Sequence, residues 1–373
     1  GYGQIRFSHR ENEGFEDLED SGSVDHLVFN AAFTPTLQDT LDVELGWSEG
    51  SFGIGDVDHP DEYATDNNTS YWLATGWSRV LEQHKWQWTF SLSDSQFEQN
   101  GGIFGDRGTN QWETEFEYQR TINQHLRAVA GAGFKHQSIK SPLNLDSDKT
   151  IDNNIVYGFA NVEWQIGENW LSNIGFMVED QETDDVRLSP RLSLHYQLSP
   201  QHNLRINTSK TYRSPTVWEY NRETIDDSGA PYVDYHFKSD KSMSAEKMES
   251  IEAAYFGRFF EGQLDLDWRV FQEDMNAGID HASWRKLEPP VTPNSFADGD
   301  PKISVFGNNK NWRVSGYDLQ VTWRPQAQTT LYLKYANVRF SSSRLSRVTP
   351  EVLSYGGDWW GIPKHVGSLF ITH

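Results

Sequence analysis

The chain has 373 residues, of which 36% are hydrophobic and 14% aromatic, and its 54 acidic residues outnumber 32 basic ones to give a formal net charge of −22. The aromatic content excludes a disordered polar chain, and the lack of long apolar stretches excludes a helical membrane protein. The negative charge argues against nucleic acid or an anionic membrane surface as a partner. The absence of cysteine removes disulfides and thiolate metal sites. A β-barrel is compatible with all of these values.

Polar and apolar residues alternate with a period of two along the chain, and this period predicts strands with two different faces. The opening stretch Gly1–Arg10 already alternates and has no signal-peptide pattern, so we expect the chain to be a piece of a longer precursor. No stretch of comparable length has helical spacing. The clearest alternating stretches are, in chain order, Leu41–Trp47, Trp86–Leu92, Trp112–Tyr118, Leu192–Tyr196, Leu264–Val270 and Tyr317–Trp323.

The connections between these stretches alternate between short and long. The short ones are Thr34–Asp39, Arg79–His84, Arg120–Gln124, Gln165–Asn169, Leu198–His202, Phe260–Gly262 and Arg324–Gln328. The long ones are Glu11–Ser23, Ser48–Thr69, Asp94–Asn110, His136–Asn153, the modest Glu179–Asp185, Lys210–Glu246, Glu273–Asn311 and Phe340–His365. This rhythm predicts an all-β fold, an up-and-down antiparallel transmembrane β-barrel of about sixteen strands with two different rims. The final stretch Val366–His373 stops early, so we expect residues 1–373 to form a single barrel segment whose last strands are missing.

The positions of the aromatic residues favour a membrane over water. On the apolar face, threading places Trp77, Trp86, Trp164, Trp170, Tyr196 and Trp323 near the short turns, and Trp47, Trp112 and Phe134 near the long loops. Two aromatic girdles that bound an apolar band match the two interfaces of a bilayer. A soluble all-β protein, such as a polysaccharide-binding or lyase protein, is the alternative outside membranes.

The opposite face carries charges of both signs. Its predicted members are Glu113, Glu115, Glu117, Arg127, Lys135, Glu163, Arg191, Arg205, Asp265, Asp267, Arg269, Asp318 and Lys334. Because dry burial of so many ions is costly, the lumen must contain water or a polar protein element.

The stretch Leu188–Tyr220, "LSPRLSLHYQLSPQHNLRINTSKTYRSPTVWEY", resembles the mid-barrel segment of TonB-dependent outer-membrane receptors, in which two strands lead into an aromatic-Arg-small-Pro tetrapeptide. The stretch Ser244–Met275 is similar to the next hairpin of that family, with acidic residues at Glu246 and Glu252, and Val314–Pro325 and Pro363–Thr372 are similar to the pieces that follow. The opening "GYGQIRFSHRENEGFED" resembles the first barrel strand after a plug domain.

The resemblance implies TonB-dependent active import of a scarce large nutrient, such as a ferric siderophore, across the bacterial outer membrane. It implies a barrel of about 22 strands, a plug domain of the same polypeptide upstream, and the TonB energy-transducing complex, outer-membrane lipid, lipopolysaccharide and a small nutrient ligand as partners. Haem is disfavoured, because the tetrapeptide reads Tyr212-Arg213-Ser214-Pro215 and the segment from Lys241 lacks the second motif of haem receptors. A passive substrate-specific porin is the alternative within transport.

The candidate binding site is formed by the three longest loops, Lys210–Glu246, Glu273–Asn311 and Phe340–His365. Loops of such length in a barrel are usually functional. Aromatic residues grip ligands by stacking, but they also pack loops against one another, and both roles stay open. The candidate ligand-binding residues are Tyr212, Arg213, Trp218, Tyr232, Tyr235, His236, Trp284, Trp359 and Trp360.

Other chemistry has little support in the sequence. The segments Glu11–Asp20 and Asp56–Asp66 are strongly acidic. In the second, the spacing of Asp56, Asp58, Asp61 and Glu62 offers oxygen ligands for Ca²⁺ but lacks the glycine and terminal glutamate of a calcium loop, so a solvated acidic surface is favoured. No nucleophile elbow, zinc motif or phosphate loop occurs. We therefore expect no enzyme activity, no metal site and no cofactor.

Overall fold

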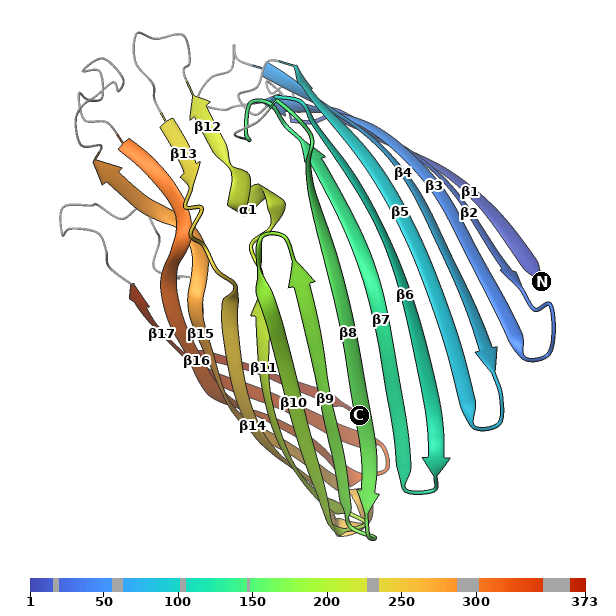
Figure 1. Cartoon of the computed structure of the whole chain (residues 1–373). Coiled ribbons are helices and arrows are strands. Elements are labelled where there is room, and N and C mark those ends of the chain that lie inside the picture. Colours follow the sequence, from blue (N-terminus) through green and yellow to red (C-terminus); the bar gives the residue numbers. More distant parts are fainter. Residues whose placement is uncertain are drawn as a thin grey trace.

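The computed structural model of the chain describes residues 1–15, 20–55, 63–100, 105–145, 148–226, 235–286, 302–344 and 363–373. It contains one curved sheet of 18 strands (Figure 1). In the part of the chain that is described, no helix is long and apolar enough to cross a membrane. The elements are β1 (Tyr2–Asn12), β2 (Gly22–Phe33), β3 (Asp39–Gly55), β4 (Tyr63–Val80), β5 (His84–Asn100), β6 (Arg107–Asn123), β7 (Leu126–Lys140), β8 (Ile151–Ile166), β9 (Trp170–Gln181), β10 (Asp184–Ser199), β11 (His202–Arg213), α1 (Val217–Asn221), β12 (Glu223–Asp226), β13 (Tyr235–Ser239), β14 (Glu246–Phe259), the short 3-10 helix η1 (Phe260–Gly262), β15 (Leu264–Lys286), β16 (Lys302–Gln326), β17 (Thr329–Arg344) and β18 (His365–Thr372).

The strands follow one another as antiparallel neighbours from β1 to β11 and then from β14 to β18, with β11 paired directly to β14. The two short strands β12 and β13 form a hairpin inside the connection between β11 and β14, and β13 also pairs with β16 in parallel. The sixteen long strands are the ones that the alternation predicts. The predicted all-β up-and-down architecture is therefore confirmed.

The short turns lie where they are predicted, but the strands at the opposite end extend further than the alternation indicates. The turn between β2 and β3 spans only the residues from Phe33 to Asp39, as expected. In contrast, β15 continues to Lys286 and β16 begins at Lys302, so much of the predicted loop Glu273–Asn311 is strand. Polar and apolar residues alternate along a strand only where one of its faces lies in an apolar environment. The backbone hydrogen bonds between two strands do not depend on that environment, so the strands can continue where the alternation ends.

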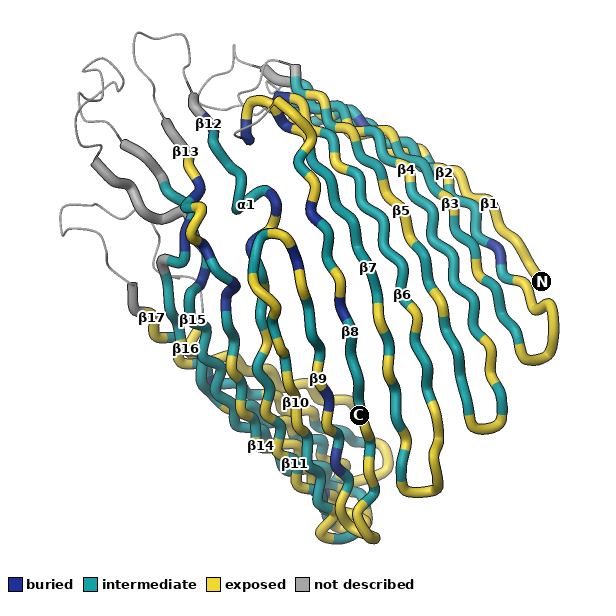
Figure 2. The backbone as a smooth tube through the Cα atoms, viewed as in Figure 1, coloured by how far each residue is buried: buried dark blue, intermediate teal, exposed yellow. Residues whose placement is uncertain are grey.

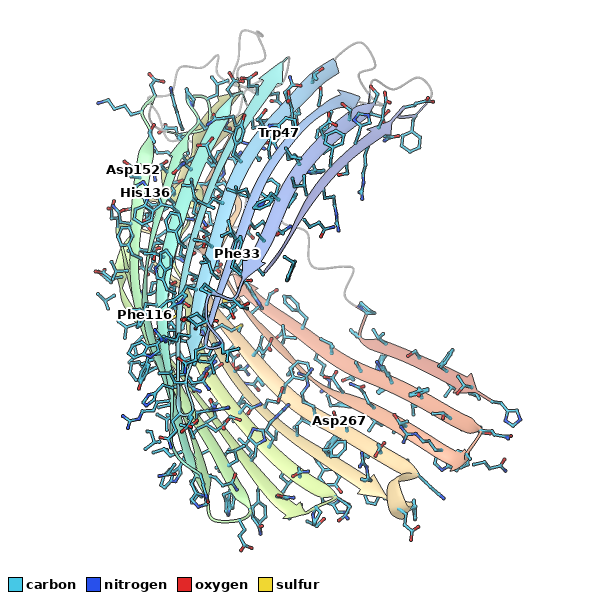
Figure 3. The ribbon with its side chains drawn as sticks, turned by 90° about the vertical axis from the view of Figure 1, so that its right-hand side faces the viewer. Phe33, Trp47, Phe116, His136, Asp152 and Asp267 are labelled. Atoms are coloured by element: carbon cyan, nitrogen blue, oxygen red, sulfur yellow. The ribbon has the colours of Figure 1, made fainter. Side chains whose placement is uncertain are left out.

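The two faces of the sheet differ as predicted. Ile174, Ile206 and Ile251 on the convex face are 52%, 54% and 56% exposed, as expected for side chains whose solvent is lipid. Figure 3 shows Phe116 on this convex side. Ring pairs mark both edges of the apolar band: Trp170 and Tyr196 lie 4.3 Å apart between ring centroids near the short turns, and Trp112 and Phe134 lie 5.0 Å apart near the other end.

Most of the deeply buried residues gather at the end of the sheet opposite the short turns, around α1 (Figure 2). A barrel wall one strand thick buries little, so a buried cluster requires a second layer. Here the second layer is the connection between β11 and β14 folded against the strand ends. We call this cluster the rim core; its members are Ser141, Asn144, Leu145, Asn153, Gln181, Pro215, Val217, Thr224, Ser239, Met243, Ala245 and Glu246.

Candidate functional site at the loop end of the barrel

The helix α1 begins at a complete capping box. Thr216 is the N-cap, its hydroxyl accepts a hydrogen bond from the Glu219 backbone N–H at 3.1 Å, and the Glu219 carboxylate accepts one from the Thr216 N–H at 2.9 Å. Pro215, which precedes the cap, is fully buried, and so is most of Val217. This local sequence therefore turns the chain inward immediately after β11 ends.

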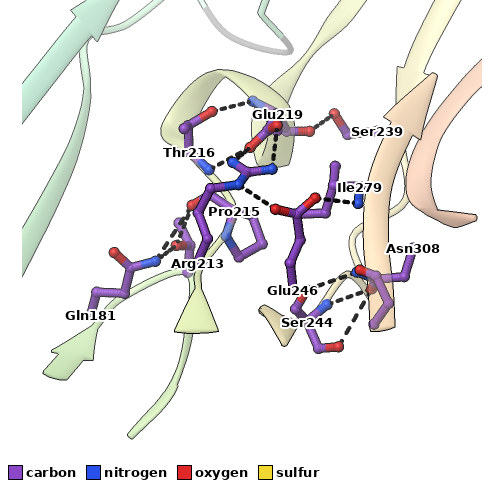
Figure 4. Close-up of polar contacts among 12 residues, drawn as sticks. Gln181, Arg213, Pro215, Thr216, Glu219, Ser239, Ser244, Glu246, Ile279 and Asn308 are labelled. Atoms are coloured by element: carbon purple, nitrogen blue, oxygen red, sulfur yellow. Dashed lines mark hydrogen bonds and ion pairs between the residues drawn. The ribbon is translucent and has the colours of Figure 1, made fainter. Parts of the chain in front are cut away.

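Arg213, the last residue of β11, holds this turn in place (Figure 4). Its Nη1 and Nη2 atoms donate to the two carboxylate oxygens of Glu219 at 2.8 and 3.0 Å, and its Nε donates to Glu246. Burial opposes ionisation of Glu219, but the hydrogen bonds from Arg213 and Thr216 outweigh it and hold the pKa of Glu219 below its usual value.

The β9–β10 connection, which lies at the loop end and is a tight turn between Gln181 and Asp184 where the sequence predicts the modest loop Glu179–Asp185, is fixed to the same segment. Thr183 donates its hydroxyl to the Pro215 carbonyl at 3.0 Å, and the Gln181 side-chain amide donates to that carbonyl at 3.4 Å. The Ser214 hydroxyl donates to Asp184 at 3.1 Å. Three hydrogen bonds therefore anchor the segment Ser214–Pro215 to the β9–β10 turn.

Beyond α1 the chain reaches the β7–β8 connection and then crosses to β16. The Asn144 carbonyl accepts the Glu223 N–H at 3.0 Å, and the Thr224 hydroxyl donates to the Asn144 side chain at 3.3 Å. On the other side, Asn308 of β16 accepts the Ser244 N–H at 2.8 Å and donates to the Ser244 carbonyl at 2.9 Å. The β11–β14 connection is thus tied to the strand ends on both of its sides.

The structure separates two candidate residues that are neighbours in the sequence. Alternation along β11 and the pairing of Tyr212 with Lys247 put the Tyr212 ring on the convex face, where Lys210 lies 5.0 Å from the ring centroid. Arg213 points to the concave side, into its two carboxylates. The two residues therefore cannot contact the same lumenal ligand.

The other candidates divide by how far the structure describes them. Trp218 in α1 lies against Arg222, whose guanidinium carbon is 5.5 Å from the centroid of the indole and 5.2 Å from that of the Phe306 ring. The backbones of Tyr235 and His236 lie in β13 and that of Trp284 in β15, but their side chains fall outside the described residues. Tyr232, Trp359 and Trp360 lie entirely outside them, as does most of the acidic segment Asp56–Asp66.

The concave face carries the charges that the alternation places there, organised in two different ways. Between β11 and β16, Glu252 accepts from Arg205 at 2.8 Å and from Arg269 at 3.1 Å, and Arg269 also donates to Asp318 at 2.7 Å. On the other half of the wall, the Tyr157 hydroxyl lies 2.7 Å from Glu113 and 2.8 Å from Glu115. Ion pairs therefore cross-link the wall between β11 and β16, whereas between β6 and β8 a phenol lies between two carboxylates, in addition to the ion pair of Arg127 with Glu163 at 3.1 Å.

Apart from Glu246, the residues of the rim core and their contacts Glu219 and Asn308 are the part of the site that the sequence interpretation missed. Glu219 was recognisable, because the spacing Thr216-x-x-Glu219 is a capping-box signature. Gln181, Asn144 and Asn308 carry no such local signal, since their partners lie far away in the chain.

Comparison with known proteins shows the same architecture. The family model of the TonB dependent receptor-like β-barrel matches residues 3–373. The chain is similar to the siderophore receptor PirA from Pseudomonas aeruginosa, with 12% identity, a TM-score of 0.72, and coverage of 87% of this chain and 58% of that one. A mutant of the ferric enterobactin receptor PfeA from the same organism is 11% identical, with a TM-score of 0.70 and coverage of 86% of this chain and 51% of that one. The alcaligin outer-membrane receptor FauA from Bordetella pertussis is 10% identical, with a TM-score of 0.59 and coverage of 99% of this chain and 59% of that one.

At these identities the solved structures share a fold, and the chain spans between 51% and 59% of their lengths. No curated protein matches the sequence. The match of the family model over nearly the whole chain, together with the apolar convex face and the two aromatic girdles, places it in the bacterial outer membrane. The chain belongs to the TonB-dependent receptor β-barrel family.

Proposed function

We propose that the protein imports a scarce large nutrient, in the first place a ferric siderophore, by TonB-dependent active transport, without catalysing a reaction. The observation that carries the proposal is the rim core. A connection that only joins two strands needs no buried layer, whereas Pro215, Val217 and Glu246 are buried where the β11–β14 connection folds back on the strand ends. A preorganised loop reduces the entropy that a ligand must remove on binding.

The ligand class is supported by the family and by the relatives in fold. PirA is described as a siderophore receptor, PfeA as a ferric enterobactin receptor and FauA as an alcaligin receptor. We propose that the aromatic residues of the loops form the capture site, namely Trp218, Tyr232, Tyr235, His236, Trp284, Trp359 and Trp360. Aromatic side chains offer large rigid contact areas at low entropic cost, which suits capture from dilute solution.

The lumen wall supports a plug domain of the same polypeptide as its occupant. The concave face offers Glu252, Arg205 and Arg269 as one ionic network and Glu113 and Glu115 as a separate carboxylate pair. Such a surface is stable against water or against a polar protein element, and a plug supplies the latter. Moving the plug out of the lumen requires work, and we propose that the TonB complex supplies it.

A transport assay separates this proposal from a passive porin. Cells that express the complete receptor should accumulate radiolabelled ferric siderophore in an energy-dependent way, and dissipation of the proton gradient should stop the accumulation. Uptake that continues at the same rate after dissipation, and that saturates only at high concentration, would favour diffusion through a pore.

A further inference from the structure

We infer that Arg213 is a positioning residue of the ligand-capture rim, which fixes the loop that carries Trp218 to the barrel wall and does not itself contact the ligand. The inference rests on the proposed function, because it concerns how the capture loop is held. It assigns to the Arg of the tetrapeptide a role that follows from its contacts in the rim core.

Arg213 stands at the point where the loop both leaves and rejoins the wall. It is the last residue of β11, and its register partner across the ladder is Glu246, the first residue of β14. The whole β11–β14 connection lies between these two residues. Their ion pair therefore closes the base of the loop at the last register pair of the two strands.

The same guanidinium reaches from the base of the loop into its interior. Its Nη atoms form a two-pronged contact with Glu219 of α1, at 2.8 and 3.0 Å. Glu219 in turn accepts the Thr216 N–H through its carboxylate, and its backbone carbonyl accepts the Ser239 hydroxyl of β13. The other carboxylate oxygen of Glu246 accepts the Ile279 N–H of β15 at 2.7 Å.

One side chain thus joins β11, in which it lies, directly to α1 and β14, and three of its nitrogens are committed to carboxylates. A lysine at this position presents a single ammonium at the end of a flexible stem and cannot reproduce the planar fork on Glu219 together with the contact to Glu246. Among the described residues, removal of the guanidinium leaves two carboxylates without a cation, one of them, Glu246, only 7% exposed. Their repulsion acts on α1 and on the loop base, while the strand ladders keep their own hydrogen bonds.

The test compares Arg213→Ala, Arg213→Lys and Glu219→Gln with Arg258→Ala in the complete receptor. Arg258 is a matched control, because it also pairs with a carboxylate, Asp265, but lies at the short-turn end of the wall. Three quantities are measured: the folded fraction in the outer membrane, hydrogen exchange of the amides of α1, and the Kd for ferric enterobactin and for ferric alcaligin.

We expect all four variants to fold, and only the first three to exchange the amides of α1 faster. In these three variants the ligand must order the loosened loop when it binds, and this entropic cost should raise the Kd of the siderophore about tenfold. The maximal uptake rate at saturating ligand should stay unchanged, and Arg213→Lys should not restore the affinity. A general folding defect would instead lower the folded fraction and the uptake rate together.

Faster exchange with an unchanged Kd would overturn the inference, since the loop would then be held by Arg213 for no benefit to capture. Unchanged exchange would overturn it as well, because the clamp would then be dispensable. If Arg213→Ala fails to fold, Glu219→Gln, which only neutralises one partner, decides in the same way. If the unaltered receptor binds neither siderophore, these two ligands are excluded, and the exchange measurement alone then decides whether Arg213 holds the loop.

Discussion

Substitution of Gly133 by alanine should destabilise the barrel by about 1–2 kcal/mol through its effect on Tyr157. Gly133 of β7 is the register partner of Tyr157 on β8, and the ring lies across the glycine. A Cβ atom built on Gly133 overlaps the Cζ and Oη atoms of that ring. The ring must therefore move, and its hydroxyl must leave Glu113 and Glu115.

The magnitude follows from opposing effects. Overpacking of this kind costs about 1–3 kcal/mol, and loss of hydrogen bonds to charged groups adds to that cost unless water replaces them. In a wet lumen water replaces them in large part. Alanine also restricts the unfolded chain and returns about 0.4–1 kcal/mol. The net cost should thus lie near the lower end of the overpacking range.

Unfolding titrations of the complete receptor in lipid vesicles measure the effect. Gly76→Ala is the matched control, because Gly76 also lies on the concave face but the nearest atom to its added Cβ is the Trp88 carbonyl oxygen at 3.9 Å. The control should be neutral or slightly stabilising. Tyr157→Ser should abolish the cost of Gly133→Ala, because no ring remains to be displaced. Equal free energies of unfolding for Gly133→Ala and Gly76→Ala would refute the reasoning.

Three further predictions concern the two faces, the rim and the loops. Leu266→Arg on the lipid face should cost about 2–4 kcal/mol if residue 266 lies near the bilayer midplane, and the lumenal neighbour change Asp267→Arg should cost less, as folding titrations into vesicles would reveal. The pKa of Glu219 is lowered in the folded protein, so its contribution is present above about pH 4.3, the value in an unfolded chain, and is lost as the pH falls through the lower folded value. Exchange of the α1 amides, corrected for intrinsic rates, should therefore accelerate in acid, and Glu219→Gln should remove this dependence. Shortening of the segment between Asp226 and Tyr235 should abolish high-affinity siderophore uptake and leave the heat resistance of the barrel intact; unaltered growth on limiting iron would place recognition elsewhere, most plainly on the plug.

The strands and turns are predictable from the sequence because each depends on neighbours along the chain. Alternation such as Leu264–Val270 reports the two environments of one strand directly, and a short turn such as Arg324–Gln328 fixes the register of the next strand. The prediction fails at the loop end of β15 and β16, where the alternation that marks a strand is lost although the ladder continues.

The rim core is not predictable in the same way. The pairing of Asn144 with Thr224 and of Ser244 with Asn308 joins residues that are 80 and 64 positions apart. A single polar residue in a loop has the same appearance whether it is buried against such a partner or free in water. For the same reason the sequence presents Arg213 as a candidate ligand contact, and only the positions of Glu219 and Glu246 reveal how its nitrogens are used.

The central claim is energy-coupled capture and import of a ferric siderophore, and uptake by cells with and without TonB tests it most directly. Cells that express the complete receptor would be supplied with a panel of radiolabelled ferric siderophores that includes enterobactin and alcaligin, at concentrations too low for diffusion to matter. We predict accumulation of at least one of them in cells with TonB and none in otherwise identical cells without it. Equal accumulation in both strains, or none of any siderophore in either, would contradict the account.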